Sequence, residues 1–289
     1  MPLVEIRSEI TAGCADAAEE ILLELGRPEW SVLEDAPSAR AWLVGIFADQ
    51  EAALHSWGIL KPLLPECAAA EPVLSDLPDR AWQDSYRVHF KAWRFGRLHW
   101  VPVWERGTYT LPGGHAALWL DPGLAFGTGN HETTRLCIER LSALTEGRPG
   151  LRVIDAGCGS GILALSAALL GCGEICAFDN DPQAVGVSRE NAELNSLAGR
   201  VEFFTADLVS GLAGRRADIV IANIQADVLS AGAGALAGAV SPGGALVLSG
   251  ILAREIDRVR ESFAAAAPGW PSDSRTLGEW CDLELRMPA

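Results

Sequence analysis

The sequence predicts an α/β protein in which a doubly wound, mostly parallel sheet follows a small α+β domain. After residue 150, short apolar runs typical of strands alternate with longer amphipathic stretches typical of helices, which is the pattern of repeated βα units. Before about residue 75, the pattern is strand, helix, strand, helix within one short segment. A length of 289 residues also exceeds that of most single domains, so one large and one small domain are expected.

The first domain is predicted to span residues 1–72. Its expected elements are strands over 3–10 and 41–48 and helices over 16–25 and 49–60, a combination that favours a ferredoxin-like α+β sandwich. A proline-containing linker is expected over 71–80. It opens a connector, residues 73–106, in which aromatic residues at helical spacing predict a linker helix over 82–93, followed by a strand over 98–103.

The second domain is predicted to span residues 107–289. Its expected strands are residues 152–156, 174–179, 201–205, 217–222 and 245–248. Its expected helices are residues 132–144, 162–170, 182–195, 227–239 and 253–263. In such a sheet, a ligand is expected beyond the carboxyl ends of the strands, where the strand order reverses.

The charge of the chain limits its partners. With 23 basic and 38 acidic residues the formal net charge is −15, so we expect no DNA partner and no RNA contact. Residues 1–75 hold thirteen of the acids and only four basic residues, a net charge of −9, which suits a basic partner.

Compartment and metal content are also predicted. No apolar run is long enough to span a bilayer, and no secretory leader is visible. Seven scattered cysteines predict reduced thiols, a cytoplasmic protein and no metal site.

A glycine loop follows the first strand of the second domain. The run is Asp155-Ala156-Gly157-Cys158-Gly159-Ser160-Gly161, whose glycines allow a sharp turn and a close approach to a ligand. Several kinds of nucleotide site share this spacing. An acid such as Asp155 would repel a pyrophosphate but suits a sulfonium that also carries an amino group. The loop therefore favours S-adenosylmethionine over NAD.

Polar residues end the next three strands. Asp179 stands 22 residues after Gly157, where a carboxylate can accept both ribose hydroxyls, although an acid at this place is also typical of a turn. Asp207 ends the third strand and is expected to meet the adenine amino group. Asn223 ends the fourth strand, where its amide can contact both the cofactor and an incoming amine, or simply cap a turn.

A glycine-rich segment, residues 120–134, lies upstream of the core and reads as a loop over a ligand. With the glycine loop and Val220-Ile221-Ala222-Asn223-Ile224, it makes residues 82–260 resemble the bacterial methyltransferases of ribosomal protein L-eleven, the PrmA family. The resemblance implies a seven-stranded methyltransferase sheet and a substrate-recognition role for the first domain. It also implies cofactor contacts by Thr134, Gly157, Asp179 and Asn223, to which the loop glycines Gly159 and Gly161 are added.

The resemblance also implies methylation of lysine side chains, and of the terminal amine, on that ribosomal protein. Phe126, Thr128 and His131 would form the loop at the substrate, Asn223 would position the amine without a dedicated base, and the enzyme is expected to be a monomer. The family loop usually reads Thr-His-Pro-Thr-Thr, whereas residues 130–134 here include Glu132 in place of proline. The added charge is expected to bear on the substrate more than on the cofactor.

Three alternatives differ in substrate or in class. A methyltransferase for DNA adenine or glutamine would be expected to show Asn-Pro-Pro-Tyr after the fourth strand, whereas this chain has Asn223-Ile224-Gln225-Ala226. A lysine methyltransferase of another protein, or a small-amine N-methyltransferase, would have a similar second domain. A cofactor-binding module without activity is disfavoured by the intact loop and Asn223.

Overall fold

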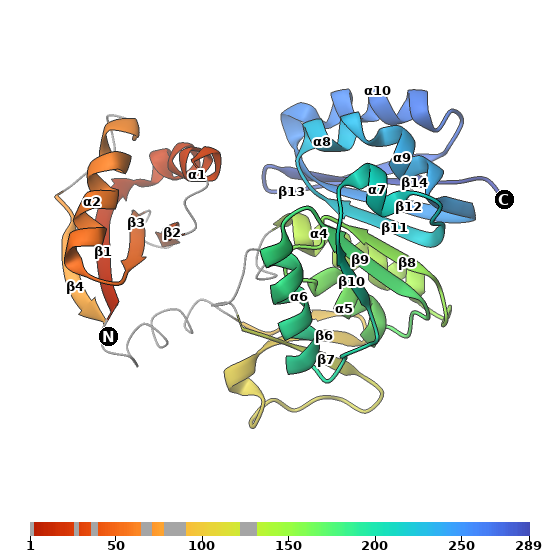
Figure 1. The fold of residues 1–289 in the computed structure, drawn as a ribbon, viewed down its shortest axis with the longest axis horizontal. Helices are drawn as coiled ribbons and strands as arrows, with labels where there is room; N and C mark the ends of the chain where they lie inside the picture. The colour runs from red at the N-terminus through yellow and green to blue at the C-terminus, as the bar shows by residue number, and fades with distance from the viewer. Residues whose placement is uncertain (1–2, 26–28, 36–39, 65–70, 78–90, 122–131) are drawn as a thin grey trace. The chain divides into compact units, whose positions relative to one another are not determined.

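The computed structural model describes residues 3–25, 29–35, 40–64, 71–77, 91–121 and 132–289. The chain divides into two compact units, Met1–Phe90 and Lys91–Ala289. Figure 1 draws the elements of each unit.

Where the structure describes it, the first unit is an antiparallel sheet with two helices. Its elements in chain order are β1 (Leu3–Thr11), α1 (Ala15–Glu24), β2 (Trp30–Asp35), β3 (Arg40–Phe47), α2 (Gln50–Leu60) and β4 (Val73–Leu77), with 3-10 turns at Ala12–Cys14 and Lys61–Leu63. The strand order β2-β3-β1-β4, with all pairs antiparallel, is that of a ferredoxin-like βαββαβ unit. The predicted α+β sandwich is therefore confirmed.

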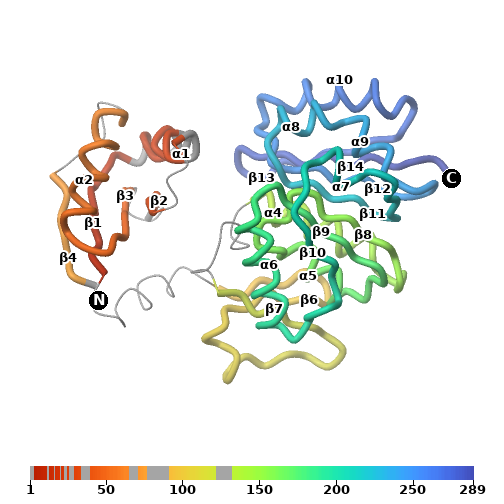
Figure 2. The backbone as a smooth tube through the Cα atoms, viewed as in Figure 1, coloured from red at the N-terminus to blue at the C-terminus, as the bar shows by residue number. Residues whose placement is uncertain are grey.

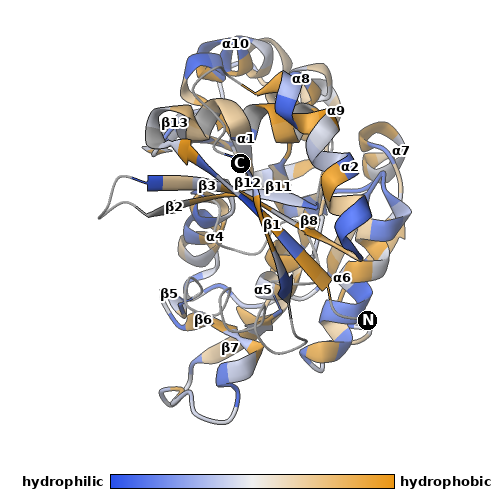
Figure 3. Cartoon of the chain, turned by 90° about the vertical axis from the view of Figure 1, so that its left-hand side faces the viewer, coloured by the Kyte–Doolittle hydropathy of each residue, from blue (hydrophilic) through white to orange (hydrophobic). Residues whose placement is uncertain are grey.

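One face of the first sheet carries the core of that unit. Val4, Ile6 and Ile10 alternate with polar residues along β1 and are buried with Trp57 of α2, and orange and blue segments alternate along β1 in Figure 3. The opposite face is charged: the Arg7 guanidinium lies 4.4 Å from the centre of a Trp42 ring. Alternation with period two thus fixes which face is buried.

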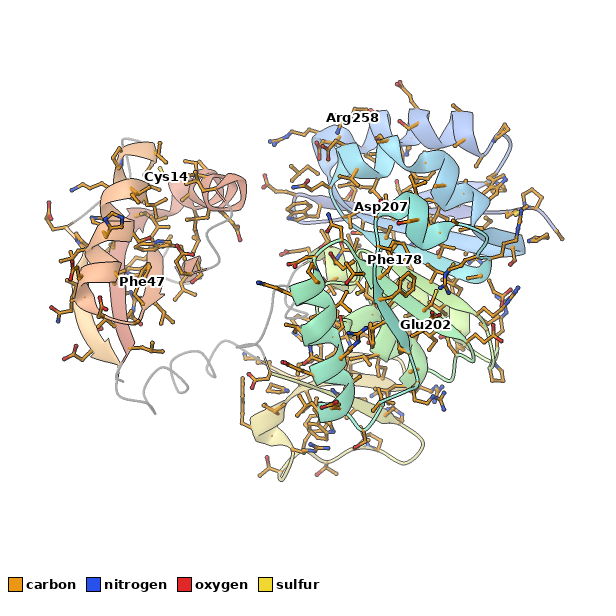
Figure 4. The ribbon with its side chains drawn as sticks, in the orientation of Figure 1. Cys14, Phe47, Phe178, Glu202, Asp207 and Arg258 are labelled. Atoms are coloured by element: carbon orange, nitrogen blue, oxygen red, sulfur yellow. The ribbon has the colours of Figure 1, made fainter. Side chains whose placement is uncertain are left out.

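Three predictions for this part of the chain need correction. Residues 71–80 were expected as a linker, but β4 pairs with β1 (Val73 opposite Arg7, Leu77 opposite Leu3), because a short strand between prolines still completes a sheet edge. Of the linker helix expected over 82–93, residues 82–90 lie outside the described residues, and Trp93 begins a strand instead. Cys14, which Figure 4 labels, is disulfide-bonded rather than reduced.

The second unit is built on a seven-stranded sheet. The strands are β8 (Val153–Ala156), β9 (Ile175–Asp179), β10 (Glu202–Thr205), β11 (Ala217–Asn223), β12 (Val240–Leu252), β13 (Ser272–Leu277) and β14 (Trp280–Arg286). Their order is β10-β9-β8-β11-β12-β14-β13. The pairs from β10 to β12 are parallel, while β14 is antiparallel to both β12 and β13. The strand order reverses between β8 and β11, which is where the rule for such sheets places a ligand.

Helices cover both faces of this sheet (Figures 1 and 2). One core packs under α4 (Glu132–Thr145), α5 (Ile162–Leu169) and α6 (Pro182–Leu194). The other packs under α7 (Leu208–Leu212), α8 (Ala226–Ala231), α9 (Ala233–Gly238) and α10 (Ile256–Ala266). Ile219 and Ile221 of β11 enter the first core, and Val220 and Ala222 enter the second, so the middle of this strand is a continuous apolar run.

A small three-stranded sheet extends the first of these cores. It consists of β5 (Trp93–Phe95), β6 (Leu98–Pro102) and β7 (Ala116–Leu120), with a 3-10 turn at Val103–Glu105. Trp100 is buried, and its indole Nε1 donates a 2.9 Å hydrogen bond to Ser166 Oγ of α5. The aromatic residues of the connector that the structure describes thus include core residues of the second unit.

The predicted strands and helices of the second domain are largely confirmed. The helix expected over 227–239 is instead two helices, which meet at Gly232, where the backbone leaves the helical conformation (φ −87°, ψ 4°). The antiparallel strands β13 and β14 were not predicted. No described helix is long and apolar enough to cross a membrane, and the described side chains hold no cluster suited to a metal ion.

Candidate functional site

The glycine loop joins β8 to α5 at the carboxyl end of the sheet. Gly157, Gly159 and Gly161 have φ values of 77°, 51° and 76°, in the left-handed region that favours glycine. The amides of Gly157 and Cys158 both donate to Phe178 O, at 2.8 and 3.0 Å, which ties the loop to β9. The predicted tight turn is therefore present.

Helix α6 packs against the glycine loop and forms hydrogen bonds with its carbonyl groups. Ser188 Oγ donates a 2.7 Å hydrogen bond to Gly159 O, and the Asn191 Nδ2 amide donates a 2.9 Å bond to Ser160 O. A Cβ at Gly161 would lie 3.0 Å from Ser188 Cβ, which leaves no room for a side chain between loop and helix. Two polar side chains of α6 thus fix the loop carbonyls. Sequence reasoning did not identify either of them.

Asp155 lies inside the protein rather than at an open surface. Its side chain is buried, and Oδ2 accepts a 3.0 Å hydrogen bond from Ala164 N, one of the free amides in the first turn of α5. Oδ1 has no hydrogen-bond partner. Burial raises the pKa of Asp155 to about 7, and the nearby charge of Asp179 adds to this effect, against the Ala164 hydrogen bond. Asp155 therefore supports the first turn of α5, and its contact with a cofactor stays a prediction.

Asp179 ends β9 beside the glycine loop. Its Oδ2 accepts a 2.9 Å hydrogen bond from Gly159 N, and its Oδ1 accepts a 3.1 Å bond from Asp181 N. The side chain is partly exposed, so each oxygen keeps a lone pair for a further donor. The next residues begin α6, with Asp181 as N-cap and Pro182 in the first turn. A carboxylate held in this way is ready to accept hydroxyl donors.

Asp207 begins α7 after β10, as Figure 4 shows. Its Oδ1 accepts hydrogen bonds from Ser210 N at 2.8 Å and Ser210 Oγ at 2.9 Å, so it acts as an N-cap. These hydrogen bonds from Ser210 hold the pKa of Asp207 below its usual value. The predicted adenine contact remains a prediction.

Asn223 and Thr134 meet at the carboxyl end of the sheet. Asn223 is the last residue of β11, and its Nδ2 donates a 3.3 Å hydrogen bond to Thr134 Oγ1 in the first turn of α4. Thr134 is 3% exposed, whereas Asn223 is partly exposed. Two residues that are 89 positions apart in the sequence are thus brought together, and the Asn223 amide keeps its carbonyl oxygen and a second N–H for a ligand.

Two glycines hold the residue after Asn223. A Cβ at Gly157 would lie 2.3 Å from Ile224 Cγ2, and a Cβ at Gly250 would lie 2.4 Å from Ile224 O. The Ile224 amide donates to Ser249 O at 3.2 Å. Ile224 is therefore packed between the glycine loop and β12, and this packing sets the place of Asn223. The sequence carries no indication of this role, because it depends on contacts between distant segments.

The structure thus gathers most of the predicted site. Gly157, Gly159, Gly161 and Asp179 form one connected group, and Asn223 and Thr134 form a second that touches it through Ile224. The predicted substrate-loop residues Phe126, Thr128 and His131 lie outside the described residues.

Comparisons with known proteins identify relatives over most of the chain. The profile of a family described as ribosomal protein L11 methyltransferase (PrmA) matches residues 10–288. A ribosomal protein L11 methyltransferase of Pseudomonas paraeruginosa is 38% identical over 283 residues, covering 92% of each chain. One of Pelobacter propionicus is 44% identical over 229 residues, covering 78% of this chain and 72% of its own length.

A solved structure is similar as well. The crystal structure of ribosomal protein L11 methylase from Lactobacillus delbrueckii subsp. bulgaricus is 27% identical, with a TM-score of 0.60, and the match covers 69% of this chain and 100% of that one.

Proposed function

This chain belongs to the ribosomal protein L11 methyltransferase (PrmA) family, and on that premise we propose that it methylates lysine side chains, and the N-terminal amine, of ribosomal protein L11. It is a methyltransferase that uses S-adenosylmethionine. The observation that carries the proposed amine chemistry is the Asn223 amide, held by Thr134 next to the glycine loop, with an oxygen and an N–H left over. A planar amide at this place suits an amine that must be oriented before it attacks.

The residues present fit the expected cofactor. The glycine loop offers backbone without side chains, and Asp179 offers carboxylate lone pairs fixed by two amides. Asp179 would hold the ribose hydroxyls, the loop would lie against the methionine part, and Asp207 would meet the adenine. The cofactor supplies an electrophilic methyl group on a sulfonium.

The protein's contribution to the reaction is positioning. Methyl transfer is an in-line displacement, so the gain comes from alignment of the two reactants and from exclusion of water. A lysine amine has an unperturbed pKa of about 10.4 and must lose its proton before it attacks. The Asn223 carbonyl oxygen would accept a hydrogen bond from the neutral amine, and the proton would leave to water. No dedicated base is needed in this scheme.

The first unit is proposed to recognise the protein substrate. Residues 1–75 carry a net charge of −9, and the charged face of their sheet holds Glu9 in a 2.7 Å ion pair with Arg40. Negative charge steers a basic ribosomal protein towards the enzyme. A small-amine enzyme would have little use for such a unit, so it favours a protein substrate over the alternative.

The test is to incubate the enzyme with labelled S-adenosylmethionine and ribosomal proteins from cells that lack this methylation. We expect label on L11, and digestion of the labelled protein should place it on lysines and the N-terminal amine. Label on another protein would support the alternative protein substrate, and label on other residue types would overturn the amine chemistry.

A further inference from the structure

The antiparallel strand β14 connects the two halves of the Asn223–Thr134 contact. Asn223 belongs to β11, whereas Thr134 belongs to α4, and the two elements come from distant parts of the chain. Each is linked to residues 281–282 of β14, on the α4 side through side chains and on the β11 side through β12.

On the α4 side, the link is a buried carboxylate between two arginines. The Asp282 side chain is 0% exposed. Arg140 of α4 donates to both of its oxygens, Nε to Oδ2 at 2.9 Å and Nη2 to Oδ1 at 3.0 Å. Arg275 of β13 donates its Nε and Nη2 to Oδ2, at 3.0 and 2.6 Å, and its amide to Oδ1 at 2.8 Å. Asp282 therefore joins α4 to the β13–β14 hairpin.

Arg275 also reaches the first turns of α4. Its Nη2 donates a 2.7 Å hydrogen bond to Leu136 O, and its Nη1 donates a 3.0 Å bond to Glu139 Oε2. Leu136 lies two residues after Thr134, so the carbonyl that Arg275 holds is in the turn that presents the Thr134 hydroxyl. Burial opposes the charge of Arg140, but the hydrogen bonds that it donates to Asp282 and Asp273 hold the pKa of its guanidinium above the usual value. This cluster of charged side chains therefore holds α4 against β13 and β14.

On the β11 side, the link runs through β12. Asn223 lies opposite Ser249, and the Ile224 amide donates to Ser249 O. The buried Ser249 Oγ in turn donates a 3.4 Å hydrogen bond to Cys281 O, next to Asp282. Pairing between β12 and β14 shifts register between Leu248 and Ile251, at this same level of the sheet. Residues 281–282 therefore lie beside both partners of the Asn223–Thr134 contact.

We infer that Asp282 is a positioning residue for methyl transfer, which acts by holding α4 so that Thr134 Oγ1 stays within reach of Asn223. This inference rests on the proposed function. The physical reason is that loss of one partner of a buried ion cluster leaves the others uncompensated and lets the elements separate. A displacement of about 1 Å near reacting groups can lower turnover about 100-fold.

The test compares Asp282→Asn with Asp218→Asn. Asp218 also pairs with an arginine through two nitrogens, with Arg152 Nη2 at 2.8 Å and Nε at 3.3 Å from its oxygens, but at the opposite end of the sheet. With L11 as substrate, we expect kcat of Asp282→Asn to fall at least tenfold per folded molecule. We expect kcat of Asp218→Asn to stay within about twofold of wild type, because its pair lies away from the site.

A double-mutant cycle separates positioning from a merely structural role. In an Asn223→Ala background, Asp282→Asn should lower kcat much less than it does in the wild type, because the contact that it supports is already gone. Equal effects in both backgrounds, or a normal kcat in folded Asp282→Asn, would overturn the inference. If Asp282→Asn does not fold, Arg275→Lys takes its place in the same cycle, since it removes the hydrogen bonds to α4 and keeps the charge. A wild-type enzyme that labels no ribosomal protein would overturn the proposed function and this inference together.

Discussion

The two ends of the central sheet each carry an arginine–aspartate cluster, and the clusters differ in what they join. At the amino end, Arg152 and Asp218 have side chains 43% and 27% exposed, and they join adjacent strands that already pair through their backbones. At the carboxyl end, Asp282 is 0% and Arg140 11% exposed, and they join a helix to a hairpin. A partly exposed pair between paired strands adds little stability. A buried pair between separate elements fixes a geometry, and it lies at the end where the site is.

Glycines show the same difference between the ends. Gly243, near the amino end of β12, has φ of 73° and nothing within 4 Å of a Cβ placed on it. Gly157 at the carboxyl end has nearly the same φ but would bring a Cβ to 2.3 Å from Ile224. One glycine serves a turn, whereas the other also makes room for the chain that carries Asn223.

The largest effect should come from Asn223→Ala. We expect kcat for L11 to fall roughly 100-fold, because the amine loses its orienting amide while the fold is kept. Asn195→Ala is the matched control, since the Asn195 amide also joins two separate segments, by hydrogen bonds to the Trp119 backbone, but away from the site. It should lower the melting temperature and leave kcat within about twofold. Full activity of Asn223→Ala would contradict the assigned role.

The effect of Gly157→Ala should be smaller than that of Asn223→Ala, and Gly243→Ala is its control. Both substitutions introduce left-handed backbone strain of about 1–2 kcal/mol, but only the first also pushes against Ile224. We expect the Kd for S-adenosylmethionine, measured by titration calorimetry, to rise at least about tenfold in Gly157→Ala alone. Equal losses of affinity in the two variants would show that strain, rather than the contact with Ile224, limits the site.

Asp179→Asn should also weaken cofactor binding, but by less. Loss of a charged acceptor for the ribose should raise the Kd for the cofactor about tenfold, since such hydrogen bonds contribute about 1.5–3 kcal/mol. Asp181→Asn is the control, because asparagine caps a helix as well as aspartate does. Unchanged cofactor affinity in Asp179→Asn would remove the ribose contact from the proposal.

The last contrast concerns the stability of the fold against pH, and it involves neither turnover nor cofactor affinity. The pKa of Asp155, raised to about 7 by burial, means that the folded protein keeps a proton that the unfolded chain releases. Its contribution to stability is therefore largest below its ordinary value of 3.8 and declines as the pH rises towards 7. Asp218 has the opposite sign, because its hydrogen bond with Arg152 lowers its pKa. It stabilises the fold at neutral pH, and this contribution is lost as the pH falls through the lowered pKa.

Urea unfolding at several pH values tests this contrast. Between about pH 4 and pH 7, one retained proton lowers the free energy of unfolding by about 1.4 kcal/mol for each pH unit, and Asp155→Asn should remove this decline. Asp218→Asn should flatten only the acid side, and by less, because that pair is partly exposed. The same slope in wild type and Asp155→Asn above pH 4 would contradict the raised pKa.

Much of the second unit could be predicted from local pattern. Buried parallel strands are continuous apolar runs, and the glycine loop follows the first of them with Asp179 at the end of the next, so strand type and cofactor class are both encoded in short segments. The first unit was harder. β2 and β4 are short edge strands, and β4 lies between prolines, so a pattern that is typical of a linker proved to be a strand.

Local sequence was enough to establish a doubly wound sheet, a glycine loop and polar residues at the strand ends, because each of these depends on neighbours in the chain. Packing of the whole fold was needed to establish that Asp155 supports α5 from inside, that Asn223 meets Thr134, and that Asp282 joins two arginines. Ala164 is 9 positions from Asp155, Thr134 is 89 from Asn223, and Arg140 is 142 from Asp282. Hydrogen bonds between separate elements depend on how the elements pack, and periodicity along one segment carries no information about that packing.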